Sequence, residues 1–131
     1  MHSKKLIALV LLSLSAFFAA ANGVKNISQE QLLSLLNAPK SSPFLVLDVR
    51  SEEEFSAGHI QGAINISHDQ IEQQLAKLSG FEDKMLVVHC RSGRRAQTAE
   101  AVLLAKGFNK VHHLTGDYKA WLAADLPLVK N

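Results

Sequence analysis

Residues 85–96 read MLVVHCRSGRRA. A short apolar run comes first, and it is followed at once by Cys90, the only cysteine in the chain. An apolar run of this length that ends in Ser and Gly is typical of a buried strand followed by a tight turn. Residues 93–106 then carry apolar side chains at helical spacing. The stretch predicts a strand, a turn and a helix, with Cys90 at the turn.

The same alternation of strands and helices extends outward along the chain and predicts an α/β domain. We expect a mainly parallel sheet of about five strands with helices on both faces. Ligands of such sheets bind beyond the carboxyl ends of the strands, where Cys90, Asp48 and Arg50 fall. Strands are expected at 24–27, 44–49, 63–66, 85–89 and 110–114, and helices from a Ser28 cap completed by Gln31, and at 51–58, 68–80, 93–106 and 117–124.

The first 21 residues have the pattern of a secretory signal peptide. A basic start, MHSKK, precedes an apolar stretch that ends in Ala19–Ala21, so we expect cleavage after Ala21 and an exported, periplasmic domain over 22–131. An uncleaved membrane anchor is the alternative, but the stretch of about 16 residues is shorter than the roughly 20 that a spanning helix needs. No cysteine stands near the cut, which excludes a lipid-modified form.

The charge balance argues against a partner bound through a broad basic surface. The formal net charge is +2, and Lys4 and Lys5 in the signal region contribute both of those charges, which leaves the rest of the chain near zero. We therefore expect neither nucleic acid nor a membrane as a partner of the processed chain. A remainder of about 110 residues fits one domain, and a monomer is the default.

The loop after Cys90 has the composition of a site for a small anion. A strand that turns into a helix aims backbone N–H groups at one point, an arrangement called a nest, and a thiol placed there favours its thiolate form. Ser92 and Gly93 suit the turn, and guanidinium groups bind oxyanions bidentately. The alternative is a buried, inert cysteine beside a solvated arginine cluster. The loop arginines are Arg91, Arg94 and Arg95.

Three motifs together resemble those of the rhodanese family of sulfurtransferases. The first, LDVRSEEEFSAGHIQGAINI at 47–66, is similar to the family's upstream signature, and HCRSGRRA at 89–96 is similar to its active-site loop. The third, VHHLTGDYKAW at 111–121, is similar to its downstream signature, in which a second glycine is usual where this chain has Asp117.

The resemblance implies a double displacement at sulfur. Cys90 would take a sulfane sulfur from a small anionic donor such as thiosulfate and pass it to a thiophilic acceptor, cyanide or a thiol. Residues 91–95 would cradle the persulfide, and Asp48 and Arg50 would support the loop. No metal and no organic cofactor is expected.

For the histidines, the tryptophan and an acidic run elsewhere in the chain, we expect structural roles. His89 precedes Cys90 in a strand, so its side chain should point to the opposite face and pack there. His112 and His113 have no ligand-like neighbours, which makes a metal site improbable. We expect His59 to fix a turn, Trp121 to lie in the core or at a pocket rim, and the acidic run 52–54 to be a solvated helix start.

Three other functions use related features. Cysteine phosphatases and arsenate reductases also place a thiolate in an anion nest, but they use a C-x5-R loop. Here the spacings are C-x3-R and C-x4-R, and position 96 is alanine. A non-catalytic binding module of the same fold is a further alternative. An oxidoreductase would want a second cysteine in a C-x-x-C motif, which the chain lacks.

Overall fold

The structure is a computed structural model that describes residues 23–38 and 43–131. The predicted signal peptide and its cut after Ala21 lie outside these residues and stay a prediction. Within the described ranges, no helix is long and apolar enough to cross a membrane.

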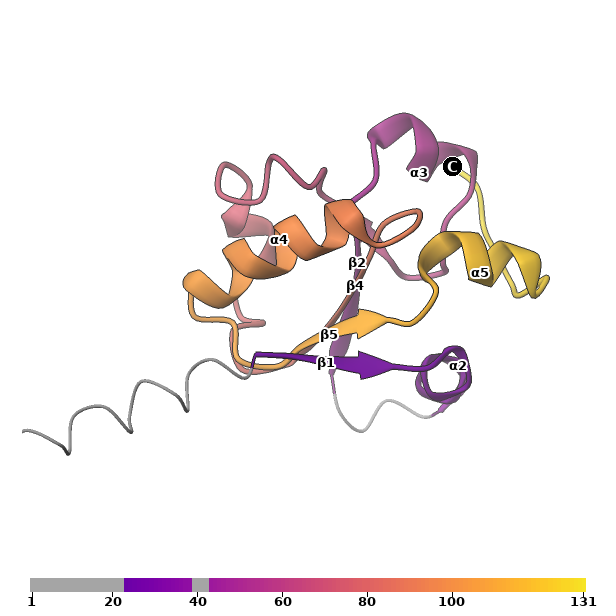
Figure 1. The fold of residues 1–131 in the computed structure, drawn as a ribbon, viewed down its shortest axis with the longest axis horizontal. Coiled ribbons are helices and arrows are strands. Elements are labelled where there is room, and N and C mark those ends of the chain that lie inside the picture. Colours follow the sequence, from indigo (N-terminus) through magenta and orange to yellow (C-terminus); the bar gives the residue numbers. More distant parts are fainter. Residues whose placement is uncertain (1–22, 39–42) are drawn as a thin grey trace, which may run out of the picture.

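The described chain forms a five-stranded sheet in which all neighbouring strands are parallel (Figure 1). This confirms the predicted fold class and places the first strand at an edge. In spatial order the strands are β1 (Val24–Ile27), β5 (Val111–Leu114), β4 (Met85–His89), β2 (Phe44–Asp48) and β3 (Ile64–Asn65).

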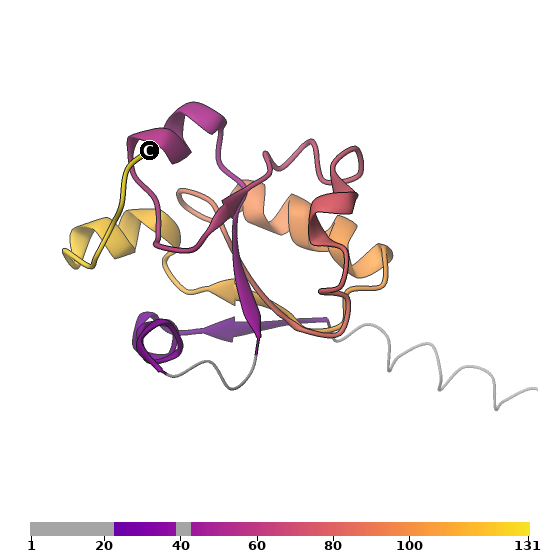
Figure 2. The same ribbon diagram turned by 180° about the vertical axis from the view of Figure 1, so that it is seen from behind.

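Helices cover both faces of the sheet, as Figures 1 and 2 show from opposite sides. One buried cluster joins the sheet to α4 and to a short 3₁₀ helix, η2, and a second cluster joins the other face to α2 and α5. A further helix, α3, follows β2. The bounds are α2 (Gln29–Asn37), α3 (Glu52–Ala57), η2 (Leu75–Leu78), α4 (Arg94–Ala105) and α5 (Asp117–Ala123).

Two helices begin with reciprocal side-chain caps. Ser28 Oγ accepts the Gln31 N–H at 3.1 Å, and Gln31 Oε1 accepts the Ser28 N–H at 2.9 Å, which confirms the predicted capping box of α2. Ser51 and Glu54 repeat the arrangement at α3. Each pair satisfies two N–H groups that a helix start would otherwise leave without partners.

The alternation of side chains along β4 aims the cysteine at one face and the preceding histidine at the other. Leu86, Val88 and Cys90 belong to the cluster under α4, whereas Val87 belongs to the cluster with α2 and α5. His89 is therefore directed away from the face that holds the thiol, as its position in the strand predicts.

The predicted helix at 68–80 is wrong. This segment is a series of turns followed by η2. The hydrogen bonds Gln70 N–H to Ser67 O and Lys77 N–H to Gln74 O span three residues, and the bond from Gln74 N–H to Gln70 O spans four but does not continue into an α-helix. Ile71 and Leu78 are nevertheless buried against the sheet. Apolar spacing of three and four residues is met equally well by turns that pack on a core, so the pattern could not distinguish them.

Candidate active site

The carboxyl ends of β2 and β4 lie side by side, and Cys90 stands just beyond the second. Asp48 is in register with His89, and the Val49 N–H donates to the His89 carbonyl at 2.9 Å. After Cys90 the chain turns within three residues into α4. Gly93 is the N-cap of that helix and has φ 113°, a conformation that favours glycine.

The turn directs a backbone donor at the thiol. The Gly93 N–H donates to Cys90 Sγ at 2.9 Å. Gly93, the N-cap of α4, provides no side-chain hydrogen bond to the first-turn N–H groups of this helix. These N–H groups point toward the N-terminal end of α4, where the thiol lies and where an anion is stabilised. The sulfur therefore occupies the point where the loop can best hold negative charge.

The N-terminus of α5 sets the orientation of the other loop amides. The Tyr118 N–H donates to the Cys90 carbonyl and the Lys119 N–H donates to the Arg91 carbonyl, both at 3.0 Å. A trans peptide unit directs its C=O and N–H to opposite sides. The N–H groups of Arg91 and Ser92 consequently face away from α5, and within the described residues neither donates a hydrogen bond to another protein group. They are free for an incoming anion.

Cys90 is buried, with 1% of its surface exposed, and its carbon atoms are part of the core. A cysteine that only fills space needs no hydrogen bond to sulfur. The donor at 2.9 Å and the two free amides beside it distinguish this thiol from such a residue. The burial restricts what can reach the sulfur to small reagents.

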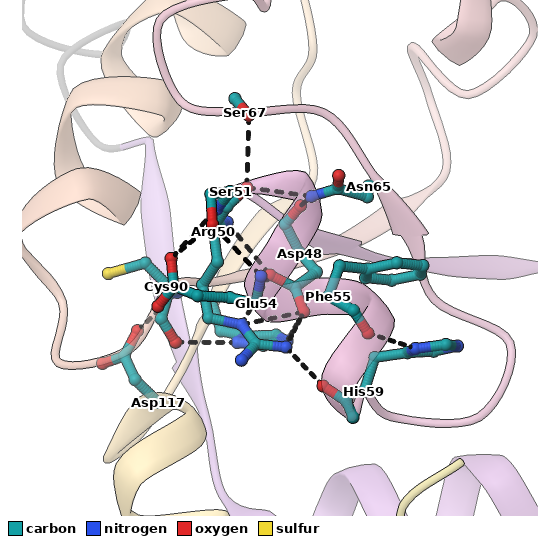
Figure 3. A network of polar contacts seen from close by, with 12 residues as sticks. Asp48, Arg50, Ser51, Glu54, Phe55, His59, Asn65, Ser67, Cys90 and Asp117 are labelled. Atoms are coloured by element: carbon teal, nitrogen blue, oxygen red, sulfur yellow. Dashed lines mark hydrogen bonds and ion pairs between the residues drawn. The ribbon is translucent and has the colours of Figure 1, made fainter. Parts of the chain in front are cut away.

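The three loop arginines lie in two different environments. Arg91 and Arg94 are exposed, and neither forms an ion pair with any other residue that the structure describes. Arg95 instead donates to Glu54 through both terminal nitrogens, at 2.7 and 3.2 Å (Figure 3 shows Glu54). This bidentate bond lowers the pKa of Glu54 to about 2 and raises the pKa of Arg95.

The position of Glu54 differs from its prediction as part of a solvated helix start. Glu52 and Glu53 are exposed, but Glu54 is only partly so, and it joins α3 to the first turn of α4. The S-x-x-E spacing of Ser51 and Glu54 in the sequence indicates a helix cap, but it does not predict the bond from Arg95.

Asp48, at the end of β2, and Arg50, two residues beyond it, form a buried ion pair. Arg50 donates to both carboxylate oxygens of Asp48, at 2.7 to 3.1 Å, and to the Gly58 carbonyl at 2.7 Å (Figure 3). Its guanidinium lies over the Tyr118 ring, 3.7 Å from the centroid. The buried ion pair thus supports Tyr118, whose N–H holds the Cys90 carbonyl. Neither side chain bonds to the sulfur.

His89 is buried behind the loop. Its Nδ1 lies 2.9 Å from the Cys90 carbonyl oxygen, and its Nε2, which has no hydrogen-bond partner among the described residues, is 3.6 Å from Asp48 Oδ2. Burial lowers the pKa of His89, which leaves the ring neutral with Nδ1–H as the donor. It braces the loop and does not face the thiol.

Sequence reasoning missed an ionic cluster beneath the loop, in which Glu100 and Asp117 are buried and His113 is partly buried. His113 Nδ1 lies 2.5 Å from Glu100 Oε2, and His113 Nε2 lies 3.0 Å from Asp117 Oδ2. The hydrogen bond to Asp117, followed by that to Glu100, raises the pKa of His113 to about 10. One signal was present in the sequence. Glu100 falls within the apolar stripe of its helix, which otherwise consists of Ala96, Ala99 and Leu103.

The remaining side chains have structural contacts. His59 Nδ1 lies 2.8 Å from the Phe55 carbonyl and its ring stacks on the Phe55 ring. His112 Nδ1 lies 3.1 Å from the Lys110 carbonyl. Trp121 is fully buried in the core. In residues 23–38 and 43–131, no group of three His, Cys, Asp or Glu side chains is arranged to hold a metal ion.

Comparisons with known proteins give a family model that matches most of the chain. A family model described as a rhodanese-like domain matches residues 28–124. A tRNA uridine(34) hydroxylase of Escherichia coli is 31% identical over 103 residues, which cover 76% of this chain and 29% of the relative. The chain spans less than a third of the length of the curated relatives it matches.

Solved structures give the same result. A rhodanese-related protein from Thermoplasma volcanium has a TM-score of 0.69 and 27% identity, over 82% of this chain and 99% of that one. A thiosulfate sulfurtransferase from Pseudomonas aeruginosa has a TM-score of 0.69 and 28% identity, over 82% of this chain and 19% of that one.

Proposed function

The chain belongs to the family of rhodanese-like domains, and from this membership and the geometry of its cysteine loop we propose that it is a sulfurtransferase. It would move a sulfane sulfur from thiosulfate or a related small donor, through a persulfide on Cys90, to a thiophilic acceptor such as cyanide or a thiol. No metal or organic cofactor takes part in this proposal.

The observation that carries the proposal is the set of backbone donors around one sulfur. The Gly93 N–H donates to Sγ at 2.9 Å, and the N–H groups of Arg91 and Ser92 are turned to the side away from α5. These donors suit a thiolate first and a persulfide anion afterwards, because both species carry negative charge at or next to Sγ.

The reaction consists of two displacements at sulfur. The Cys90 thiolate attacks the outer sulfur of thiosulfate, a Cys–S bond forms, and the S–S bond of the donor breaks. Sulfite leaves with the electron pair of that bond. The acceptor then attacks the outer sulfur of the persulfide, which releases the Cys90 thiolate. With cyanide the product is thiocyanate, and no net oxidant or reductant is consumed.

The three loop arginines have different proposed roles. Arg91 and Arg94 are exposed and unpaired among the described residues, so they suit the recruitment of an anionic donor. Arg95 is engaged by Glu54, and its proposed role is to hold the start of α4 rather than to contact the donor.

The same geometry argues against a phosphatase or arsenate reductase. Such a loop needs an arginine one position later, where the chain has the buried Ala96, and the arginine nearest to that position bonds to Glu54. The loop is also too short to surround a tetrahedral phosphate. The binding-module alternative predicts instead that Cys90 never gains sulfur.

We also propose that the protein is exported and works as a monomer in the periplasm after cleavage behind Ala21. The support is the sequence pattern of residues 1–21. N-terminal sequencing of the protein from a periplasmic fraction tests the cleavage, with Asn22 as the expected first residue. A chain that keeps Met1 and stays in the membrane fraction would contradict it. Size-exclusion chromatography tests the oligomeric state.

Steady-state kinetics tests the proposed activity. With thiosulfate and cyanide varied together, a double displacement gives parallel reciprocal plots, and Cys90→Ser abolishes thiocyanate formation. Arg91→Ala and Arg94→Ala should each raise the KM for thiosulfate more than they lower kcat, because they remove charge that recruits the donor. Hydrolysis of p-nitrophenyl phosphate without thiocyanate formation would overturn the proposal in favour of a phosphatase.

A further inference from the structure

One carboxylate reaches both ends of the cysteine loop. Asp117 Oδ1 accepts the N–H of Cys90 at 3.0 Å, at the start of the loop (Figure 3). Asp117 Oδ2 lies 3.2 Å from the point where a Cβ on Gly93 would stand, at the end of the loop. The four residues from Cys90 to Gly93 therefore form an arch over a single side chain.

The conformation of Asp117 is unusual for an aspartate. Its φ is 55°, in the left-handed region that favours glycine and, after it, asparagine and aspartate. Only 3% of the residue is exposed. A strained backbone and a buried carboxylate both cost stability, so their presence at this position indicates that the side chain is needed there.

Two further residues fix the orientation of that carboxylate. His113 Nε2 lies 3.0 Å from Asp117 Oδ2, and His113 Nδ1 lies 2.5 Å from Glu100 Oε2. An imidazole between two carboxylates donates from both nitrogens, in accord with a pKa raised to about 10. The cluster joins α4, β5 and α5. All three side chains therefore converge directly beneath the cysteine loop.

We propose that Asp117 is a positioning residue for the Cys90 nest, and that His113 and Glu100 hold its carboxylate in place. The bond from the Cys90 N–H to Oδ1 fixes the first peptide unit of the loop. The packing of Gly93 on Oδ2 fixes the last, whose N–H meets the sulfur. The consequence for sulfur transfer rests on the proposed function, but the effect on anion binding at the thiol does not.

Two substitutions at Asp117 separate the effect of its side chain from the effect of backbone strain, because both replacement residues tolerate a positive φ. Asp117→Gly removes the carboxylate and leaves a residue that adopts φ 55° freely, whereas Asp117→Asn keeps an Oδ1 acceptor for the Cys90 N–H. Asp125→Gly is the matched control, because Asp125 has φ 57° but is exposed beyond the C-terminus of α5.

The readout is the ratio of the alkylation rates of Cys90 by iodoacetate and by iodoacetamide. Both reagents need the thiolate, but only iodoacetate brings an anion that the loop amides can bind. We expect the wild-type ratio to exceed that of a free cysteine peptide and to fall about tenfold in Asp117→Gly, the effect of losing one hydrogen bond near a charged group. Asp125→Gly should stay within about twofold of the wild type, whereas Asp117→Asn, which keeps Oδ1 but loses the bond that Oδ2 accepts from His113, should fall less than Asp117→Gly.

A wild-type ratio in Asp117→Gly would overturn the proposal. So would an equal loss in Asp117→Asn, because the hydrogen bond from Cys90 would then not be the contact that matters. If Asp117→Gly does not fold, as judged by circular dichroism, His113→Ala is the second variant. It frees Oδ2 while Oδ1 remains, so we expect an intermediate ratio, and an unchanged ratio would overturn the proposal.

The same variants keep this inference distinct from the proposed function. The alkylation ratio is measurable whether or not the protein transfers sulfur. If the wild type forms a persulfide, its rate of formation should fall in parallel with the ratio in Asp117→Gly. A wild type that never gains sulfur refutes the sulfurtransferase and leaves the ratio to decide the role of Asp117.

Discussion

At the scale of single residues, Gly93 meets two demands that no other residue type can meet together. Its N–H must point at Cys90 Sγ, which the structure achieves with φ 113°. Its Cα must also lie against the Asp117 carboxylate, where a Cβ would stand 3.2 Å from Oδ2. The first demand excludes most side chains through backbone strain, and the second leaves little room for any.

We predict that Gly93→Ala slows sulfur loading of Cys90 by about tenfold or more, because one hydrogen bond to the charged sulfur is displaced. It should also destabilise the fold by about 1 to 2 kcal/mol, the cost of a left-handed conformation for an L-residue. Stopped-flow measurement of sulfite release after mixing with thiosulfate checks the rate, and urea unfolding checks the stability.

Gly107→Ala is the control for strain alone. Gly107 has φ 93° just beyond the C-terminus of α4, and no atom lies within 4 Å of the position of an added Cβ. It should lose stability without losing the sulfur-loading rate. Equal rates for Gly93→Ala and Gly107→Ala would show that the bond from Gly93 to the sulfur has no part in the reaction.

The sequence predicted the residues of this loop because they are contiguous. Cys90, Ser92 and Gly93 define a strand end and a turn within four positions, and local rules connect such a turn to anion binding. Glu100, His113 and Asp117 come from three separate elements. Only the tertiary fold brings them together, and Glu100 in an apolar stripe was the single local hint.

At the scale of elements, the loop is held from both sides. The first turn of α5 donates two N–H groups to loop carbonyls, through Tyr118 and Lys119. On the other side, α3 is joined to α4 by the bond between Glu54 and Arg95. The N-terminal turns of α3, α4 and α5 therefore hold the nest together. Its geometry depends on α3 and α5, which carry no reacting group.

The bond between α3 and α4 leads to a prediction in acid. The pKa of Glu54 is lowered to about 2 in the folded state, so the contribution of the pair is present above the unfolded value of 4.5 and is lost as the pH falls through 2. Both side chains are about one third exposed, so Glu54→Gln should cost only about 0.5 to 1 kcal/mol at pH 7.

Urea unfolding at pH 7 and at pH 3 measures this contribution, with Glu53→Gln as the matched control. Glu53 is an exposed neighbour in the same helix turn. The difference between the two variants should shrink at the lower pH. A difference that is the same at both pH values would mean that the ion pair does not stabilise the folded state.

Local sequence patterns predict some of these elements correctly and fail for residues 68–80. The strand positions and the capping box of α2 depend on local patterns, and those patterns are sufficient to predict them. Residues 68–80 bury Ile71 and Leu78 at helical spacing and yet form turns and η2. A segment that packs on the sheet needs a few buried apolar side chains but not a continuous helix. The spacing of those side chains alone does not determine the backbone conformation between them.

At the scale of the whole molecule, the cluster of Glu100, His113 and Asp117 makes the stability of the fold depend on pH in the alkaline range. His113 has a pKa raised to about 10, against 6.5 in the unfolded chain, so the folded state binds an extra proton between these values. The contribution is complete below pH 6.5 and is lost as the pH rises through 10. We predict that the free energy of unfolding falls over this range, by at most about 1.4 kcal/mol per pH unit.

Thermal or urea unfolding between pH 6 and pH 10 tests this dependence. His113→Gln should flatten the decline, whereas His112→Gln, the same change in the neighbouring residue of β5, should keep the wild-type slope. Identical slopes in the wild type and both variants would show that His113 does not hold its proton in the folded state.

If Cys90 carries a sulfur atom between donor and acceptor, intact mass spectrometry detects that atom on the protein. The purified protein is weighed after exposure to thiosulfate and again after added cyanide, with Cys90→Ser treated in the same way. We expect a gain of one sulfur atom that cyanide removes and that the variant never shows. A thiol that alkylates readily with iodoacetamide but gains no sulfur from thiosulfate or from any other small persulfide donor would contradict it.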